Sequence, residues 1–551
     1  MRKLSIAFLL FITVLFASCG ALTENEGADD TTVPTVTRPE FLDMGTDLSY
    51  KCFDGARLMQ YNNMKTDDYI SAVAYYESEG GTVYGASEIG AMLSTTLSFE
   101  DEYYVVSYNG SKKELYVTRS EKETKLPVIE KTSDKVCNAS VTQCYSSEIS
   151  DMSYIVRLED GSFILVDGGY KHHSSEIYKT LCEMNGSEDN IRIKAWLITH
   201  SHDDHYQAFS DFSKKYADKV KLDYVFCSPA NIEYADKYLQ TEVITDTALY
   251  DGAKLFFVHT GMVFDFGSVK LEILLTPEHL YKKNAPGDFN ETSVIYRIKN
   301  DDGSVIFLGD CGSSASEWLV KTYGAALKSD FVQVSHHGCE TATAELYDHI
   351  QAPTLFWPCY ESLLSSDRGM YVKQHIIEAE YSKEHILHGY GRATRELSYR
   401  PTYEYLDLVP KSIDKVEASP TVSDVKLENG VISYKVTASQ GKRLDPYVSF
   451  TLDDIDTEKY NALRIVIDSD AAKNGKLYFT AGNTTKFGER LTESLCEQGA
   501  SKDGTMTLII YLADNKEYFD KLTSLRFDLG TSDGQEVKIY SVKAFYVNTD
   551  K

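Results

Sequence analysis

The sequence predicts an α/β central domain between a small N-terminal α+β region and a C-terminal all-β sandwich. From about residue 134 to 410, short apolar strands alternate with amphipathic helical segments, as is typical of α/β domains. After Lys415 the chain changes to strands separated by turn-rich loops, with little helix. All 13 histidines lie between His172 and His388. Folding does not require that partition, and a metal-binding central domain would produce it.

The composition excludes several classes of protein. The chain has 551 residues, which corresponds to three or four domains at roughly 150 residues each. Its 42% hydrophobic and 12% aromatic residues exclude wholesale disorder. With 56 Lys and Arg against 83 Asp and Glu, the net charge is −27, which repels the phosphates of nucleic acid and anionic membrane surfaces. We therefore do not expect nucleic acid to be a partner.

Residues 1–19 predict a signal peptide. A basic start precedes an apolar run from Leu4 to Ala17, which is shorter than the roughly 20 residues of a transmembrane helix. The run ends in Leu-Phe-Ala-Ser-Cys-Gly (15–20), which resembles the lipobox of bacterial lipoproteins. The resemblance implies that Cys19 carries a lipid and anchors the protein to the outer face of the cytoplasmic membrane, outside the cell. The alternative is an ordinary secretory signal with a chance cysteine.

The rest of the chain divides into four segments. Residues 20–40, rich in Thr, Glu, Asp and Gly, predict a flexible tether. Residues 41–130 predict a small α+β domain with one helix near residues 86–93. Residues 134–410 predict the central domain, with strands at 154–158, 163–166, 195–199 and 305–308 and helices at 174–184 and 205–217.

Residues 420–549 predict a β-sandwich that follows a charged, proline-containing linker. Its last strands, near residues 525–529 and 537–540, resemble those of galactose-binding-like and carbohydrate-binding sandwiches. The resemblance implies a cell-wall or other polysaccharide as partner. Aromatic residues that are candidates for such binding are Tyr447, Tyr478 and Tyr546.

The segment Leu197–His205 carries the strongest chemical pattern. An apolar strand leads into a loop with three imidazoles and two carboxylates. His200 and His202, two residues apart at the strand end, can bind one metal ion. Asp204 and His205, past the turn, can face a second ion. Imidazole together with carboxylate suits Zn²⁺ first and Mn²⁺ or Fe²⁺ next.

The regions around this motif resemble the metallo-β-lactamase fold superfamily, which implies an αββα sandwich. Upstream, an apolar strand ends at Asp167-Gly168-Gly169, similar to the family's strand whose Asp supports the metal loop. Downstream, another apolar strand leads to Asp310, similar to the family's bridging aspartate, which would hold two ions roughly 3.5–4 Å apart.

Paired histidines follow a third apolar strand, at His336-His337-Gly338. The resemblance implies that one of them completes the second metal site. We assign His337 as the ligand and His336 as the residue that faces substrate, and the reverse order remains open.

One departure from the family separates this chain from many members, which carry a further histidine between the first motif and the bridging aspartate. Here that interval offers only His259, His279 and the pair Asn290 and Ser293. The Asn-x-x-Ser pattern is similar to the hydrolase domain of DNA-uptake competence proteins and to phosphorylcholine esterases. It implies that Asn290 and Ser293 support the site and that His200, His202 and Asp310 leave coordination positions open.

These observations lead to one expected function and two alternatives. The expected function is an extracellular, membrane-anchored hydrolase with two divalent ions, Zn²⁺ first, that cleaves phosphodiester or phosphocholine-like groups. Asp204 would orient or deprotonate the attacking water, and His336 would protonate the leaving group or hold the phosphate. The alternatives are a hydrolase of esters, lactones or lactams, and a non-catalytic glycan-binding surface lipoprotein.

Overall fold

The computed structural model describes residues 36–131, 134–147, 150–230, 237–280, 289–339, 342–364, 368–379, 381–401, 405–438, 444–472, 475–488, 492–494, 504–512 and 515–546. The elements below belong to the compact unit Pro39–Lys551. The expected signal peptide, Cys19 and most of the expected tether lie outside the described residues. Among the helices of the described part, none is both long and apolar enough to cross a membrane.

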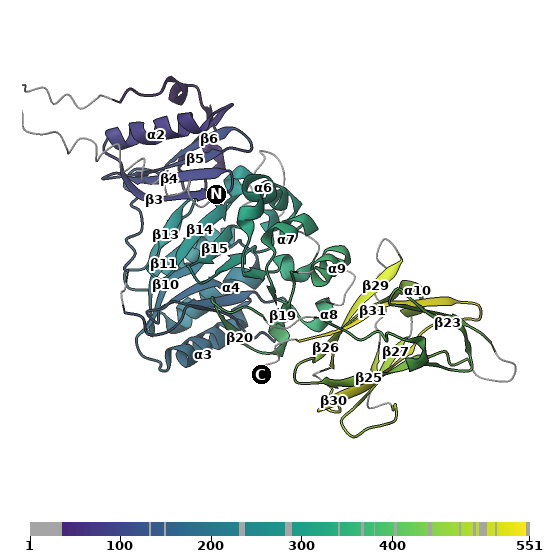
Figure 1. Cartoon of the computed structure of the whole chain (residues 1–551). Coiled ribbons are helices and arrows are strands. Elements are labelled where there is room, and N and C mark those ends of the chain that lie inside the picture. The colour runs from purple at the N-terminus through teal and green to yellow at the C-terminus, as the bar shows by residue number, and fades with distance from the viewer. Residues whose placement is uncertain are drawn as a thin grey trace, which may run out of the picture. The chain divides into compact units, whose positions relative to one another are not determined.

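The N-terminal region is an antiparallel sheet of six strands covered by one helix (Figure 1). The strand order is β1-β2-β6-β5-β4-β3. Helix α2 (Thr66–Ser78) buries Tyr69, Ala72 and Tyr76 against this sheet, at the spacing of one helix face. The strands are β1 (Thr46–Asp47), β2 (Arg57–Asn62), β3 (Thr82–Ile89), β4 (Met92–Ser98), β5 (Tyr103–Asn109) and β6 (Glu114–Arg119).

The prediction of a helix near residues 86–93 is wrong, because this segment forms the hairpin of β3 and β4. Gly90 turns the chain between the two strands with φ 58°, a left-handed conformation that favours glycine. The helix lies upstream at α2, where Asp67 and Asp68 stand in the first turn and favour the helix dipole.

The central region consists of two seven-stranded sheets packed face to face. The first has the order β12-β11-β10-β9-β8-β7-β20, and the second has the order β13-β14-β15-β16-β17-β18-β19. The strands of the first sheet are β7 (Ser140–Gln143), β8 (Ser153–Arg157), β9 (Phe163–Asp167), β10 (Ile191–Leu197), β11 (Val220–Cys227), β12 (Lys254–Phe257) and β20 (Ala393–Glu396). Those of the second are β13 (Val263–Asp265), β14 (Lys270–Leu275), β15 (Ile295–Lys299), β16 (Ser304–Phe307), β17 (Phe331–Gln333), β18 (Thr354–Trp357) and β19 (Glu384–Leu387).

Helices cover the outer face of each sheet, so the layers run helix, sheet, sheet, helix. Along β9, Phe163 and Leu165 pack under helices while Ile164 and Val166 face the second sheet, as the alternation of a strand buried on both sides requires. The helices on the first sheet are α3 (Ser174–Asn185), α4 (Asp203–Tyr216) and α5 (Lys237–Thr247). Those on the second are α6 (Ser313–Tyr323), α7 (Ala344–Ile350), α8 (Glu361–Leu364) and α9 (Met370–Glu378). The predicted αββα architecture is confirmed.

The C-terminal region is all-β apart from the short helix α10 (Ser469–Ala472), with two sheets around a core of their own. One sheet runs β23-β24-β31-β26-β29, with β21 also paired to β31, and the other runs β22-β25-β30-β27-β28. Because β21 precedes the expected linker, the strand pairing of this region begins upstream of residue 420. The strands are β21 (Leu406–Asp407), β22 (Val416–Ala418), β23 (Val422–Glu428), β24 (Val431–Val436), β25 (Val448–Asp456), β26 (Ala462–Asp468), β27 (Lys476–Ala481), β28 (Thr492–Ser494), β29 (Thr505–Tyr511), β30 (Lys521–Asp528) and β31 (Glu536–Phe545).

A buried ionic triad joins the N-terminal region to the central sheets. His259 lies between two carboxylates, with Nε2 3.1 Å from Asp54 Oδ2 and Nδ1 3.2 Å from Glu278 Oε1. Although burial alone lowers the pKa of His259, Asp54 and Glu278 raise that pKa to about 10. Both carboxyl groups have lowered pKa values despite their burial, because they pair with His259. The triad therefore holds a charged imidazole inside the protein.

Replacing His259 with glutamine should destabilise the protein by roughly 3–5 kcal/mol at pH 6, the usual cost of breaking a buried ion pair. The folded-state pKa lies above the ordinary value of 6.5, so this stabilisation is full below pH 6.5 and is lost as the pH rises toward about 10. We expect the difference in Tm between wild type and His259→Gln to be large at pH 6 and to shrink at pH 10. Thermal unfolding at both pH values checks this, and an equal difference at both would contradict it.

Candidate metal centre

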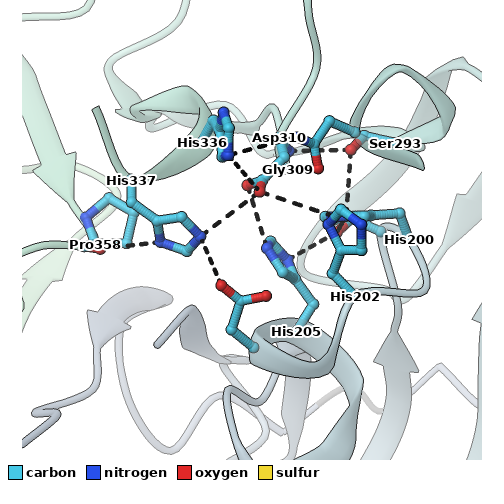
Figure 2. A network of polar contacts seen from close by, with 12 residues as sticks. His200, His202, His205, Ser293, Gly309, Asp310, His336, His337 and Pro358 are labelled. Carbon is cyan, nitrogen blue, oxygen red and sulfur yellow. Dashed lines mark hydrogen bonds and ion pairs between the residues drawn. The ribbon is translucent and has the colours of Figure 1, made fainter. Parts of the chain in front are cut away.

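The predicted metal ligands gather at the carboxyl ends of parallel strands from both central sheets. The loop after β10 carries His200 and His202, and helix α4 begins with Asp203 and presents Asp204 and His205. In the second sheet, Asp310 follows β16 and His337 follows β17. Because parallel strands end at one edge of a sheet, the two sheets bring these groups together (Figure 2).

The first cluster consists of His200, His202 and Asp310, whose ligand atoms lie within 4.8 Å of one another. His200 Nε2 is 3.1 Å from His202 Nδ1 and 3.9 Å from Asp310 Oδ2. The other ring nitrogen of His200 contacts Ser293 Oγ at 3.3 Å, which orients the ring toward the cluster.

The second cluster consists of Asp204, His205 and His337, again within 4.8 Å. His337 Nε2 is 3.3 Å from Asp204 Oδ2 and 3.6 Å from Asp310 Oδ2. Its Nδ1 donates to the carbonyl oxygen of Pro358 at 3.1 Å, which leaves Nε2 free to point inward. Asp310 therefore stands between the two clusters.

Asp167 stabilises the loop that follows β10 and carries His200 and His202. Its carboxylate accepts hydrogen bonds from Thr199 N, Thr199 Oγ1 and His205 Nδ1, each at 2.8 Å. The bond to His205 fixes the tautomer with Nε2 toward Asp310. Gly168 lies against Ala208 of α4, where a Cβ would approach the Ala208 methyl to 3.0 Å.

His336 is placed differently from His337. His337 is buried, whereas the His336 side chain is 23% exposed. His336 Nε2 is 3.8 Å from Asp310 Oδ2 and 3.4 Å from Asn290 Nδ2. Of the two histidines, His337 lies in the second cluster, and His336 lies beside Asp310 on the more open side.

The backbone at the site is strained. Asp167, His336 and His337 adopt left-handed conformations with φ of 52°, 48° and 55°, which cost non-glycine residues of order 1 kcal/mol or more each. Gly309 has φ 52°, and a Cβ there would approach Ser293 Oγ to 2.8 Å. Glycine is therefore required directly before Asp310. Strain of this kind persists where surrounding contacts hold a functional geometry.

The donor set fits divalent cations. Three buried atoms that point into the site have no hydrogen-bond partner in the described part of the chain: His205 Nε2, His337 Nε2 and Asp310 Oδ1. His205 Nε2 and Asp310 Oδ1 lie 3.2 Å apart but are not aligned as a hydrogen bond. Buried polar atoms are ordinarily satisfied, so their convergence indicates cation ligands. Clusters of His and Asp able to bind metal are thus present.

The electrostatics of the centre agree with this assignment. Burial lowers the pKa of His205 and His337, but nearby carboxylates outweigh this effect. Asp310 and Asp204 raise the pKa of His337 to about 9. Asp310 and Asp167 raise the pKa of His205 well above its usual value. The pKa of Asp310 is well below its usual range despite burial, because of the charges of His205 and His337. Cations must displace protons from these rings, so metal binding should release protons.

Two of the three candidates for a further ligand lie elsewhere. His259 belongs to the ionic triad, and the His279 ring packs edge-on against Tyr116 with ring centroids 4.6 Å apart. Asn290 is the candidate that reaches the centre, next to His336.

Sequence reasoning missed three groups at the site. They are Thr199, the Pro358 carbonyl and Phe289, whose ring lies 5.8 Å from that of His202. Thr199 directly precedes His200, so its place in the motif could have revealed it. The other two groups have no pattern in the sequence.

The chain is similar to known proteins over parts of its length. A family model described as "Beta-lactamase superfamily domain" matches residues 164–329. No curated protein matches the sequence. Among solved structures, the metallo-β-lactamase fold protein YhfI from Bacillus subtilis has 13% identity and a TM-score of 0.27, with 40% of this chain and 85% of that chain covered.

Two further solved structures are similar to larger and smaller parts of the chain. CmlA, a diiron β-hydroxylase from Streptomyces venezuelae, has 14% identity and a TM-score of 0.31 over 50% of this chain and 55% of its own, so about half of its length is spanned. The xylan-binding module CBM86 from Roseburia intestinalis has 17% identity and a TM-score of 0.16 over 24% of this chain and 92% of its own. Residues 164–329 thus match the beta-lactamase superfamily domain, and the domain built around them has the metallo-β-lactamase fold.

Proposed function

We propose that this protein is a hydrolase that uses two divalent metal ions, with Zn²⁺ the best suited, to cleave phosphoester bonds. The observation that carries the proposal is the position of Asp310, which belongs to the first histidine-containing cluster and lies 3.6 Å from His337 Nε2 of the second. Ions bound in the two clusters would activate water and stabilise the negative charge that develops on the substrate.

The chain's own residues divide the remaining work. Asp204 has a side chain 18% exposed, so its carboxylate can accept a hydrogen bond from a water at the edge of the second cluster and orient that water. His336 and Asn290 lie beside Asp310 with polar nitrogens that can hold substrate oxygens. Phe289 next to His202 limits the shape of the group that enters.

Phosphoesters are favoured over acyl substrates by the composition of the site. The first cluster has three ligands among the described residues, which leaves coordination positions for substrate oxygens. A phosphoryl group presents several such oxygens at once, and the side chains of His336 and Asn290 beside Asp310 can bind them. Esters, lactones and lactams present a single carbonyl oxygen to the metal ions, so fewer of the open coordination positions and polar side chains would contact the substrate.

A substrate panel tests the proposal. The metal-loaded protein should hydrolyse bis-p-nitrophenyl phosphate or p-nitrophenylphosphorylcholine with kcat/KM at least tenfold above that for p-nitrophenyl acetate, a lactone or a cephalosporin. His336→Ala should lower phosphodiester turnover by about 100-fold, the usual contribution of one positioned acid–base group, with metal content unchanged. His349→Ala, which alters a histidine on the outer side of α7, should have no effect.

Three outcomes of the panel would contradict the proposal. Faster turnover of the lactone or cephalosporin than of the phosphodiester would support an acyl hydrolase. Wild-type turnover by His336→Ala would exclude its role at the substrate. No turnover of any substrate by metal-loaded protein would support the non-catalytic alternative.

We further propose that the protein acts outside the cell, anchored to the membrane by a lipid on Cys19, with the C-terminal sandwich binding a polysaccharide. The anchor rests on the lipobox-like residues 15–20 of the sequence. Partition of the full chain into detergent, lost in Cys19→Ala, is the expected behaviour. Binding through the sandwich would raise the local concentration of polymeric substrate at the metal centre.

A further inference from the structure

An organised polar and aromatic surface lies on the outer face of the sheet β22-β25-β30-β27-β28. Along β30, Leu525 and Phe527 are buried in the sandwich core, so the intervening Arg526 points away from that core. Tyr478 of β27 is the direct cross-strand neighbour of Arg526. Tyr447 precedes β25, the strand on the other side of β30. Strands β25, β27 and β30 can be followed in Figure 1.

The guanidinium of Arg526 lies over the rings of Tyr447 and Tyr478. Its carbon Cζ lies 3.8 Å from the ring centroid of Tyr447 and 5.1 Å from that of Tyr478. Nε donates to Asp528 Oδ1 at 2.6 Å, and Nη2 donates to Asp528 Oδ2 at 2.7 Å. The Arg526 and Asp528 side chains remain about one-fifth exposed, at 20% and 19%. Stacking and the bidentate pair fix Arg526 in one orientation at the surface.

This surface combines the two features that bind a sugar ring. The partly exposed surfaces of Tyr447 and Tyr478 that Arg526 does not cover offer rigid, amphipathic contact area for the apolar C–H face of a pyranose. The fixed arginine fork and the carboxylate of Asp528 offer a donor and an acceptor side by side, which suits neighbouring hydroxyl groups. Because the rings, the fork and the carboxylate are already ordered, little conformational entropy would be lost on binding.

The charges of the surface indicate which class of polysaccharide fits. The positive charge of Arg526 is balanced by Asp528 at hydrogen-bond distance and by Asp445, whose Oδ2 lies 3.8 Å from Nη2. The whole chain carries a net charge of −27. An anionic polymer would therefore be repelled at long range and find no uncompensated cation at the surface.

We propose that Tyr447, Tyr478, Arg526 and Asp528 form a binding site for a neutral polysaccharide. The proposal rests on the proposed function in one respect, namely that the sandwich binds polysaccharide, and it names the residues and the class of polymer. The site is separate in sequence and in core from the metal centre, so its occupation delivers substrate and takes no part in the chemistry.

Affinity electrophoresis of the purified chain tests the site. Neutral xylan or mixed-linkage β-glucan in the gel should retard the protein, and polygalacturonate should not. Tyr478→Ala and Arg526→Lys should each weaken the retardation at least tenfold. Arg526→Lys keeps the charge but loses the planar fork. Tyr540→Ala is the matched control, because Tyr540 points outward from the other sheet, on β31.

The Tm of each variant is measured beside its affinity. Weaker binding with a Tm within about 2 °C of wild type supports the site. The proposal is overturned if neither neutral polymer retards the wild-type protein, if Tyr478→Ala and Arg526→Lys bind as wild type, if Tyr540→Ala loses binding equally, or if polygalacturonate binds as well. Turnover of a small phosphodiester should be unchanged in all of these variants. Failure of that turnover in the wild type would count against the hydrolase and leave the binding result intact.

Discussion

Replacing Asp310 with alanine is expected to lower kcat/KM for a small phosphodiester by at least roughly a thousandfold, or about 4 kcal/mol of transition-state stabilisation. Asp310 Oδ2 lies 3.9 Å from His200 Nε2 and 3.6 Å from His337 Nε2. The substitution therefore removes a carboxylate that belongs to the first cluster and lies beside the second, and two cations held in these clusters would repel each other more strongly. Steady-state kinetics with metal added in excess measure the effect.

The control for this result is Asp301→Ala, which removes an exposed carboxylate from the turn between β15 and β16. Its kinetics should equal those of the wild type. Circular dichroism should show that Asp310→Ala remains folded, so that its loss of turnover reports on the metal centre. Turnover of Asp310→Ala within tenfold of wild type would refute the bridging assignment.

Replacing Asp167 with alanine is expected to impair both the fold and the metal centre. The change leaves the amide and hydroxyl of Thr199 and Nδ1 of His205 without their acceptor inside the protein. Loss of a buried carboxylate from such a network costs roughly 3–5 kcal/mol of stability. Because His205 also loses its orienting bond, metal affinity should fall about 10- to 100-fold. Thermal unfolding and a metal titration measure the two effects.

A milder substitution separates the causes. Asp167→Asn keeps an acceptor for Thr199 but loses the negative charge beside His205. Its Tm should therefore lie closer to that of the wild type than the Tm of Asp167→Ala does, while its metal affinity should still be reduced. Asp218→Ala, at an exposed position after α4, should change neither. If Asp167→Ala matched the wild type in both Tm and metal affinity, Asp167 would have no supporting role.

Much of the metal centre could be predicted because its ligands are local in sequence. His200, His202, Asp204 and His205 follow one apolar strand within six residues, in the loop after β10 and the first turn of α4. Asp310 was predictable for a similar reason, because an apolar strand leads to a single carboxylate. Which of His336 and His337 is the metal ligand could not be predicted, because their orientations depend on the left-handed backbone at both residues.

Other features depend on contacts between distant segments and left no local pattern. The hairpin of β3 and β4 is not predictable from apolar spacing alone, because that spacing does not reveal the turn at Gly90. The Pro358 carbonyl reaches His337 only after β18 pairs with β17. Tyr478 and Arg526 are 48 positions apart, and only the register of β27 on β30 makes them neighbours.

The central claim is that this site binds two metal ions, and the metal content of the purified chain tests it most directly. Protein prepared without chelator should contain about two transition-metal ions per chain, mainly zinc, by elemental analysis. Dialysis against a chelator should remove the ions together with phosphodiester turnover, and added Zn²⁺ or Mn²⁺ should restore both. Protein that contains no zinc, manganese or iron, and takes up none when these ions are supplied, would contradict the account.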